Sequence, residues 1–226
     1  IRPHLITWYI HEPDAVGHRY GPFSPELSKT VTYLDSLVGI FIQRVNKLPY
    51  AKKINIIVTS DHGMGCISEE RVVYLDDFIK ESWVRTIQGG NPNFNIMAQE
   101  NCLDSVYSSL KALEHISVWK SSEVPERFHY GNNPRITDIV VLADSAWSIG
   151  LRESNYDYNG GTHGYDNANT DMHAIFYACG PAFKKSHIQP TFNNTDLYTL
   201  IAHILGLKAA PNDGSFNNVK DMLNSN

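Results

Sequence analysis

Two hydrophobic periodicities alternate along the chain and predict a mixed α/β structure. Residues 4–10 form an apolar, strand-like run, and Ser24-Pro25 supplies a helix start. Residues 53–59 are mostly β-branched and do not alternate, which is typical of a central strand covered on both faces. A strand, a helix and a strand in this order predict a βαβ unit, whose right-handed crossover brings both carboxyl ends to one edge of a sheet. The helix is predicted from apolar residues that recur at helical spacing up to about Leu48: Leu27, Val31, Leu34, Val38, Phe41 and Val45.

The rest of the chain continues the alternation of strands and helices. Residues 101–115 carry an apolar stripe at helical spacing, and residues 197–207 predict a last helix that Gly206 ends. Residues 139–143 and 174–178 predict two further strands. Since no repeat or clear linker interrupts the pattern, we expect residues 1–226 to belong to a single α/β domain. Turns are predicted at residues 89–92 and 130–134, from their glycines and prolines.

Composition excludes some classes of function. The formal net charge is -5, and no basic run is longer than Lys52-Lys53 or Lys184-Lys185, so a groove that binds nucleic acid through its phosphates is not expected. Ligands the size of a nucleotide remain compatible with this charge. No apolar run reaches the roughly 18 to 20 residues of a membrane span. The three cysteines have no metal-ligand spacing and are predicted to be buried thiols: Cys66, Cys102 and Cys179.

Three short clusters combine carboxylate or imidazole side chains with glycine, close to predicted strands. They are Glu12-Pro13-Asp14 with Gly17-His18, Ser60-Asp61-His62-Gly63-Met64, and Gly161-Thr162-His163-Gly164-Tyr165. Carboxylates and imidazoles together suit zinc and are acceptable to manganese or iron. We therefore expect five side chains to converge on one edge of the sheet as the metal ligands of a binuclear hydrolase: Asp14, His18, Asp61, His62 and His163.

The local structure can be predicted for the first of these clusters. Pro13 and Gly17 disfavour a continuous helix through Asp14 and His18, so a loop is predicted there. Any one Asp-His pair at a strand end is more often a hydrogen-bonded turn than a ligand pair. Three clusters together favour metal binding, because unpaired charges after apolar strands are costly. The other histidines lack such neighbours, although His11 lies close to the first cluster.

Two further features of the sequence, one residue and one triplet, each have two interpretations. Tyr9 precedes Asp14 by five positions and is either a core aromatic of the first strand, the commoner role, or a surface on which a ligand stacks. Asn193-Asn194-Thr195 is a glycosylation sequon, a triplet that often occurs by chance.

Several longer strings closely resemble the ecto-nucleotide pyrophosphatase/phosphodiesterase family. They follow the family's order over nearly the whole chain, and the family usually has an acidic residue where this chain has His11. The strings are Tyr9-Ile10-His11-Glu12-Pro13-Asp14 with Gly17-His18 and Tyr20-Gly21-Pro22, Thr59-Ser60-Asp61-His62-Gly63-Met64, Pro125-Glu126-Arg127-Phe128-His129-Tyr130, Gly161-Thr162-His163-Gly164-Tyr165-Asp166-Asn167 and Gly180-Pro181-Ala182-Phe183.

The resemblance implies an alkaline-phosphatase-like fold, a mixed sheet flanked by helices, with two zinc ions. It implies that Asp14, His18 and His163 hold the zinc nearer the substrate phosphate. Asp61 and His62 would hold the zinc that activates the nucleophile, and Tyr9 matches an aromatic that stacks on the nucleobase. The implied location of the protein is extracellular, periplasmic or at the cell surface.

The family's threonine nucleophile and one further aspartate ligand have no counterpart in this sequence. The chain, which begins at Ile1 without methionine, is therefore interpreted as the C-terminal part of a catalytic domain. It is expected to contain no catalytic nucleophile, to need the missing N-terminal segment as a partner, and to be inactive alone. Any membrane tether would lie outside it.

In the intact protein, the family mechanism is attack of the threonine on phosphorus to give a phosphoenzyme, which is then hydrolysed. The expected substrate is a small nucleotide diester or pyrophosphate, which would yield a nucleoside 5′-monophosphate, and Tyr9 mildly favours this class. The alternatives are a lysophospholipid or choline phosphodiesterase, another hydrolase of the alkaline phosphatase superfamily, and a non-catalytic metal-binding fragment.

Overall fold

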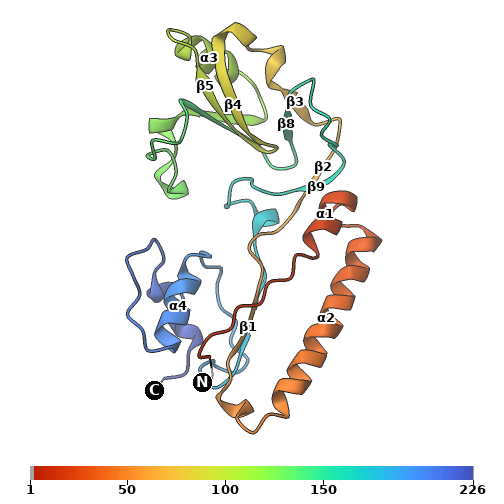
Figure 1. The fold of residues 1–226 in the computed structure, drawn as a ribbon, viewed down its shortest axis with the longest axis vertical. Coiled ribbons are helices and arrows are strands. Elements are labelled where there is room, and N and C mark those ends of the chain that lie inside the picture. Colours follow the sequence, from red (N-terminus) through yellow and green to blue (C-terminus); the bar gives the residue numbers. More distant parts are fainter. Residues whose placement is uncertain (1–2, 226) are drawn as a thin grey trace. The chain divides into compact units, whose positions relative to one another are not determined.

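The computed structural model describes residues 3–225, which form two compact units (Figure 1). One unit comprises the chain up to Ile10, the segment Tyr33–Asp61 and the chain from Ala174 onward. The other comprises His11–Thr32 and His62–His173. We call them the terminal unit and the central unit. Ile1, on which the expectation of a missing segment partly rests, lies outside the described residues.

A four-stranded antiparallel sheet forms the larger part of the central unit. Its strand order is β4 (Val84–Gly90), β5 (Asn93–Ala98), β7 (Ile139–Ala143) and β6 (Ile116–Lys120). All five residues of β7 are buried, as expected for an apolar run with a strand on each side. Helix α3 (Leu103–Lys111) contributes Val106 and Leu110 to the core of this sheet. The predicted strand at residues 139–143 and the helix within residues 101–115 are therefore confirmed.

Two short strand pairs complete the sheet structure of the central unit. β2 (Gly65–Ile67) pairs antiparallel with β9 (Gly160–Thr162), and β3 (Val72–Tyr74) pairs in parallel with β8 (Ser148–Gly150). These pairs connect segments far apart in the sequence, so each short strand depends on its partner. The turn predicted at residues 89–92 is the connection between β4 and β5.

Helix α2 (Pro25–Asn46) begins at the predicted residue. The hydroxyl of Ser24 accepts a hydrogen bond from the amide of Leu27 at 3.1 Å, which satisfies one of the free amides of the first turn. The helix ends two residues before Leu48. None of its residues is buried in the described structure, and the predicted apolar stripe is exposed at Val31 and Phe41.

The terminal unit contains one strand pair and one further helix. β1 (Ile56–Thr59) pairs antiparallel with β10 (Phe176–Cys179), and α4 (Asp196–Ile204) lies near the carboxyl end of the chain. The strand predicted at residues 174–178 and the last helix are thus confirmed with shifted bounds. Their small core consists of Phe183, Leu200, Val219 and Met222. The short 3-10 helices of the two units are Ala51–Lys53, Leu75–Asp77, Glu81–Trp83, Ser121–Glu123, Glu126–Phe128, Thr170–Met172, Phe216–Asn218 and Lys220–Met222.

The mixed α/β class is confirmed, but details of the predicted strands and cysteines are wrong. Residues 4–10 are exposed and form no strand in the described structure. β1 is part of a two-stranded pair with partly exposed residues rather than a covered central strand, so the predicted βαβ unit does not form. Cys66 and Cys179 are exposed rather than buried, and neither is in a disulfide. Within residues 3–225, no helix has the length and apolar character needed to span a lipid bilayer.

Candidate metal centre

The first ligand cluster lies on a helix rather than on the predicted loop. Helix α1 (Asp14–Tyr20) follows Pro13, which occupies the N-cap position, so its missing amide costs no hydrogen bond of the helix. The carbonyl of Pro13 accepts a hydrogen bond from the amide of Gly17 at 2.9 Å. Since residues four apart share a helix face, Asp14 and His18 lie side by side.

Glycine allows α1 to approach β9 closely. A Cβ added to Gly17 would lie 3.1 Å from Met64, and one added to Gly161 would lie 2.7 Å from the carbonyl oxygen of Gly17. A Cβ on Gly160 would lie only 2.2 Å from the carbonyl oxygen of His18. The glycines of the first and third clusters therefore serve to bring helix and strand into backbone contact. That contact places α1 beside the strand that leads to His163.

Asp14 stands between two imidazoles. Its Oδ1 lies 3.5 Å from Nε2 of His18 and 3.6 Å from Nε2 of His163. Both distances are too long for a good hydrogen bond. Oδ1 is buried and has no hydrogen-bond partner among the described residues. A buried carboxylate oxygen without a partner is costly, and a cation at this position would remove the cost.

The second cluster brings His62 to the same place. The ring of His62 stacks on that of His163, with centroids 3.5 Å apart and planes inclined by 15°. The ligand atoms of Asp14, His62 and His163 all lie within 4.8 Å of one another, and they form the one such group found in residues 3–225. His18 is tilted against His163, with centroids 5.0 Å apart. The structure therefore brings together four of the five predicted ligands.

Two backbone carbonyls orient the imidazoles. Nδ1 of His18 lies 2.9 Å from the carbonyl oxygen of Gly161, and Nδ1 of His62 lies 2.8 Å from that of Gly63. Because a carbonyl oxygen can only accept, the hydrogen bond requires a proton on Nδ1 in both rings. A neutral ring then carries its lone pair on Nε2. Such orientation of imidazoles by a hydrogen bond to the far nitrogen is usual for metal ligands.

The separations around Asp14 fit a zinc ion. Ligands about 2.0 to 2.1 Å from a tetrahedral zinc are separated from one another by about 3.3 Å. The separations of 3.5 and 3.6 Å from Asp14 to the two histidines are close to this value. The donor set of one carboxylate and neutral imidazoles also suits zinc. The residues present therefore fit the metal that the sequence predicts.

The loop after His163 is held by an ion pair that the sequence prediction missed. Both guanidinium nitrogens of Arg127 donate to the carboxylate of Asp166, and Arg127 also donates to Asn167 at 3.2 Å. This pairing holds the pKa of Asp166 below its ordinary value. Both residues occur in strings that carry the family resemblance, but nothing in the linear sequence indicates that they meet.

The buried side chain of Tyr165 also holds this loop. Its hydroxyl donates to the carbonyl of Trp147 at 2.7 Å, and burial raises the pKa of this phenol, so the hydroxyl stays protonated as a donor. The loop that carries His163 is therefore fixed at both Tyr165 and Asp166.

The two remaining predicted site residues belong to the terminal unit. Asp61 is the last residue of its segment and directly precedes His62, and its carbonyl oxygen accepts from the side chain of Asn194 at 3.5 Å. Tyr9 is 77% exposed, so its ring is not packed in a core formed by residues 3–225 and is accessible in this chain. His11 is exposed as well, and its nearest carboxylate is that of Glu12 at 3.9 Å.

Comparison with known proteins agrees with the family resemblance of the sequence. The family model for type I phosphodiesterase / nucleotide pyrophosphatase matches residues 1–166. The chain is 42% identical to human ectonucleotide pyrophosphatase/phosphodiesterase family member 5 over 222 residues, which cover 98% of this chain and 46% of that protein. It is 40% identical to human bis(5'-adenosyl)-triphosphatase ENPP4 over 221 residues, which cover 97% of this chain and 48% of that protein. The chain thus spans about half the length of these curated relatives.

Solved structures show the same similarity in three dimensions. Murine ectonucleotide pyrophosphatase / phosphodiesterase 5 superposes with a TM-score of 0.87 at 41% identity, covering 94% of this chain and 57% of that chain. An inactive variant of the same murine protein, with a threonine replaced by alanine, has been solved in complex with AMP and gives the same TM-score.

Proposed function

Because the chain belongs to the type I phosphodiesterase / nucleotide pyrophosphatase family, we propose that the protein hydrolyses phosphodiester or pyrophosphate bonds of nucleotides with the aid of two zinc ions. The observation that carries the proposal is the buried, unpartnered Oδ1 of Asp14, with imidazole nitrogens 3.5 and 3.6 Å away. A carboxylate oxygen in such surroundings calls for a cation.

Five residues of this chain hold the metals in the proposal. Asp14, His18 and His163 bind one zinc, and Asp61 with His62 contributes to the other. The stack of His62 on His163 supports two sites in close proximity, since the two rings lie against each other while belonging to different ligand sets. Bound zinc would supply Lewis-acid stabilisation of charge on the phosphate oxygens during displacement.

The protein's own groups prepare this site. The carbonyls of Gly161 and Gly63 hold the imidazoles of His18 and His62, so that Nε2 of each neutral ring carries the lone pair. The ion pair between Arg127 and Asp166 limits the motion of the loop that carries His163. Little reorganisation is then needed when metal and substrate bind.

The substrate class is supported by the relatives and by Tyr9. One relative bears the name of a bis(5'-adenosyl)-triphosphatase, and another has been solved with AMP. The exposed ring of Tyr9 offers a face on which a base can stack. We propose nucleoside 5′-monophosphates as products, with a threonine upstream of this chain as nucleophile. The inactivity of the murine variant in which one threonine is replaced by alanine supports this assignment.

The cellular setting is also part of the proposal. The names of the relatives place them among ectonucleotide enzymes, which supports an extracellular or cell-surface location. The chain is proposed to form one catalytic domain together with a further segment of the same protein, since it spans about half of its relatives.

The test uses the full-length gene product, loaded with zinc and assayed on a dinucleotide diester. We expect two equivalents of zinc and release of a nucleoside 5′-monophosphate. Asp14→Ala and Asp61→Ala should each lose metal and lower kcat/KM by more than about 100-fold, because even partners of metal ligands cost 10- to 100-fold when removed.

Asp35→Ala, at an exposed position of α2, is the matched control and should change neither metal content nor rate. Less than one equivalent of zinc, or full zinc content in the double variant of Asp14 and Asp61, would refute the metal assignment. Metal binding without turnover of any diester would favour a non-catalytic metal-binding protein instead. Turnover of choline or lysophospholipid diesters with no nucleotide activity would move the substrate to that class.

A further inference from the structure

The one N-x-S/T triplet of the chain, Asn193-Asn194-Thr195, lies directly before helix α4 in the terminal unit. Such a triplet is a frequent chance match, so its position in the fold decides what it means. A glycan is bulky and hydrophilic, and a folded protein tolerates it only where the asparagine amide reaches solvent.

The backbone around Asn193 is held in place by a buried carboxylate. Asp196 is only 1% exposed, and its Oδ2 accepts a hydrogen bond from the amide of Asn193 at 3.0 Å. The same side chain accepts from the amide of Ser215 at 2.6 Å and from the side chain of Asn218 at 3.0 Å. The turn before α4 is therefore a fixed feature of the fold rather than a loose loop.

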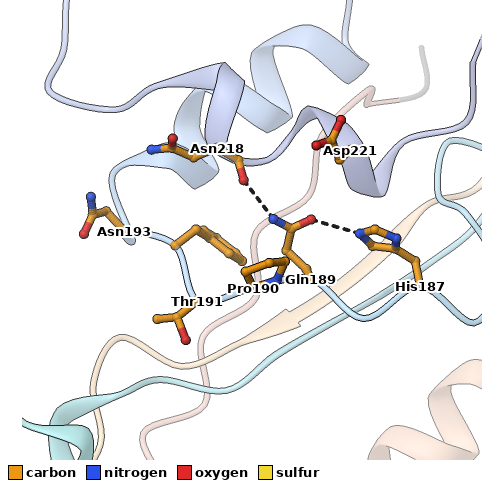
Figure 2. A pocket seen from close by; sticks show the side chains of 8 residues that line it. His187, Gln189, Pro190, Thr191, Asn193, Asn218 and Asp221 are labelled. Carbon is orange, nitrogen blue, oxygen red and sulfur yellow. Dashed lines mark hydrogen bonds between the residues drawn. The ribbon is translucent and has the colours of Figure 1, made fainter.

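The side chain of Asn193 is left outside this network. Asn193, Asn194 and Thr195 are all exposed, and the hydroxyl of Thr195 makes no capping hydrogen bond to α4. Asn193 is one of the residues that line a cavity of about 490 Å³. Its side chain points away from the hydrogen-bonded His187 and Gln189 on the other side of that cavity (Figure 2). A glycan attached there would extend into solvent without breaking a contact of the terminal unit.

We propose that Asn193 carries an N-linked glycan. This inference rests on the extracellular location proposed above, because the modification occurs in the secretory pathway. The side-chain nitrogen Nδ2 of Asn193 forms a bond to the anomeric carbon of an oligosaccharide supplied by a lipid-diphosphate-linked donor. The bond from that carbon to the diphosphate oxygen breaks, the lipid diphosphate leaves, and the amide nitrogen loses one proton. The side chain of Asn193 changes from a primary to a secondary amide, with no change in oxidation state.

The physical consequence concerns the start of α4. The glycan excludes other macromolecules from the surface formed by residues 193–195, while Asp196 keeps the backbone beneath it in position. The modification is thus expected to change surface properties such as solubility and protease resistance, and to leave the fold of the terminal unit intact.

The experiment expresses the full-length gene product in mammalian cells behind a heterologous secretion signal. Secreted and cell-associated protein are both digested with a peptide N-glycosidase in heavy-oxygen water, which marks each formerly glycosylated asparagine as a labelled aspartate. Peptide mass spectrometry is expected to find the label at Asn193. Asn193→Gln and Thr195→Ala should each remove one glycan from the intact mass, whereas Thr195→Ser retains the triplet and should keep it.

An unlabelled Asn193 peptide in protein that has entered the secretory pathway would overturn the inference. So would an intact mass that is the same for the wild type, Asn193→Gln and Thr195→Ala. These readouts do not depend on zinc content or hydrolysis, so failure here and failure of the proposed function are distinguished by separate measurements.

Discussion

Arg127 donates hydrogen bonds to both carboxylate oxygens of Asp166, which lies three residues after His163. Arg127 is in the 3-10 helix Glu126–Phe128, so a segment distant in sequence fixes the loop of a predicted metal ligand. Planar, two-pronged contact with a carboxylate is a property of arginine that lysine does not share.

Arg127→Lys tests whether this contact positions the loop. We expect zinc affinity and kcat/KM to fall by roughly 10-fold, the lower end of the range for residues that orient metal ligands. The free energy of unfolding should change by less than about 1 kcal/mol, because the side chains of Arg127 and Asp166 are 50% and 36% exposed. Metal titration and thermal unfolding of the full-length protein measure the two effects.

Arg152→Lys is the matched control, since Arg152 makes a similar two-pronged contact with Asp77 in the 3-10 helix Leu75–Asp77. It should leave zinc affinity unchanged. Equal losses of affinity in the two variants would mean that Arg127 has only a general structural role.

The same ion pair predicts a pH dependence of stability. Arg127 holds the pKa of Asp166 below its ordinary value of 3.8. A carboxyl whose pKa is lowered on folding stabilises the protein above its unfolded pKa and loses that contribution as pH falls through the folded value. The stability difference between the wild type and Arg127→Met should therefore be complete at neutral pH and shrink below about pH 4.

Denaturant unfolding of the metal-free protein between neutral and acid pH measures this difference without interference from ligand protonation. In an Asp166→Asn background, the effect of Arg127→Met should show no such dependence on pH. A difference that grew on acidification would contradict the assigned direction of the shift.

Gly63 is expected to tolerate no side chain. Its amide donates to the carbonyl of Met172 at 3.0 Å, and an added Cβ would lie 2.0 Å from the carbonyl oxygen of Asp171. Gly63→Ala should therefore displace the turn that carries His62, with a loss of stability of about 1 to 3 kcal/mol and weaker zinc binding.

Gly39→Ala supplies the control for Gly63→Ala. Gly39 lies inside α2, where an added Cβ meets nothing within 4 Å, so this change should be neutral or stabilising by up to about 1 kcal/mol. Thermal unfolding and zinc titration compare the two variants. Unchanged stability and zinc affinity in Gly63→Ala would show that the turn is less constrained than its contacts indicate.

Tyr9→Ala tests the proposed stacking on a base. If the exposed ring binds the base, kcat/KM for a dinucleotide diester should fall by a factor that corresponds to roughly 1 to 3 kcal/mol. A small chromogenic diester without a base should be affected less. Steady-state kinetics on both substrates decide the matter, and equal losses on both would indicate a structural role for Tyr9.

The chain of residues 1–226 expressed alone is predicted to be inactive. The first reason is that our proposal assigns the nucleophile to an upstream segment. The second is that several large apolar side chains, among them Ile6, Trp8 and Ile188, are exposed in this chain and would be covered by that segment. Turnover of a dinucleotide diester by the isolated, zinc-loaded chain is compared with that of the full-length gene product. Near-equal rates would show that the nucleophile lies within these residues.

The helix α2 could be predicted from the sequence, whereas α1 could not. Apolar spacing and the Ser24 cap are local signals, and both operate in the folded chain. Pro13 and Gly17 are also local signals, but by themselves they indicate a break in a helix. Pro13 precedes the first helical residue, and Gly17 is required by the approach of Met64. The structural role of Gly17 therefore depends on its contact with Met64, which is distant in the sequence.

The strands, too, could be predicted only in part, because a strand needs a partner as well as a suitable composition. Residues 4–10 have strand-like composition but no partner strand in residues 3–225, so they form none. β2 and β9 contain glycines and weak strand propensity, and they form a pair because their segments meet in the fold. The candidate ligands were identified because their residue types are chemically unusual beside apolar runs. Their detailed arrangement, such as the stack of His62 on His163, depends on contacts between segments that are distant in the sequence.

The backbone contact between α1 and β9 gives this site a use in protein engineering. Because glycine carbonyls and Cα atoms set the spacing, the side chains at positions 14 and 18 can be exchanged without moving the main chain that carries them. His18→Asp would replace an imidazole with a second hard oxygen donor at a fixed position, which favours manganese over zinc. If the proposed zinc site forms, its metal preference could be redesigned by single substitutions on one face of a short helix.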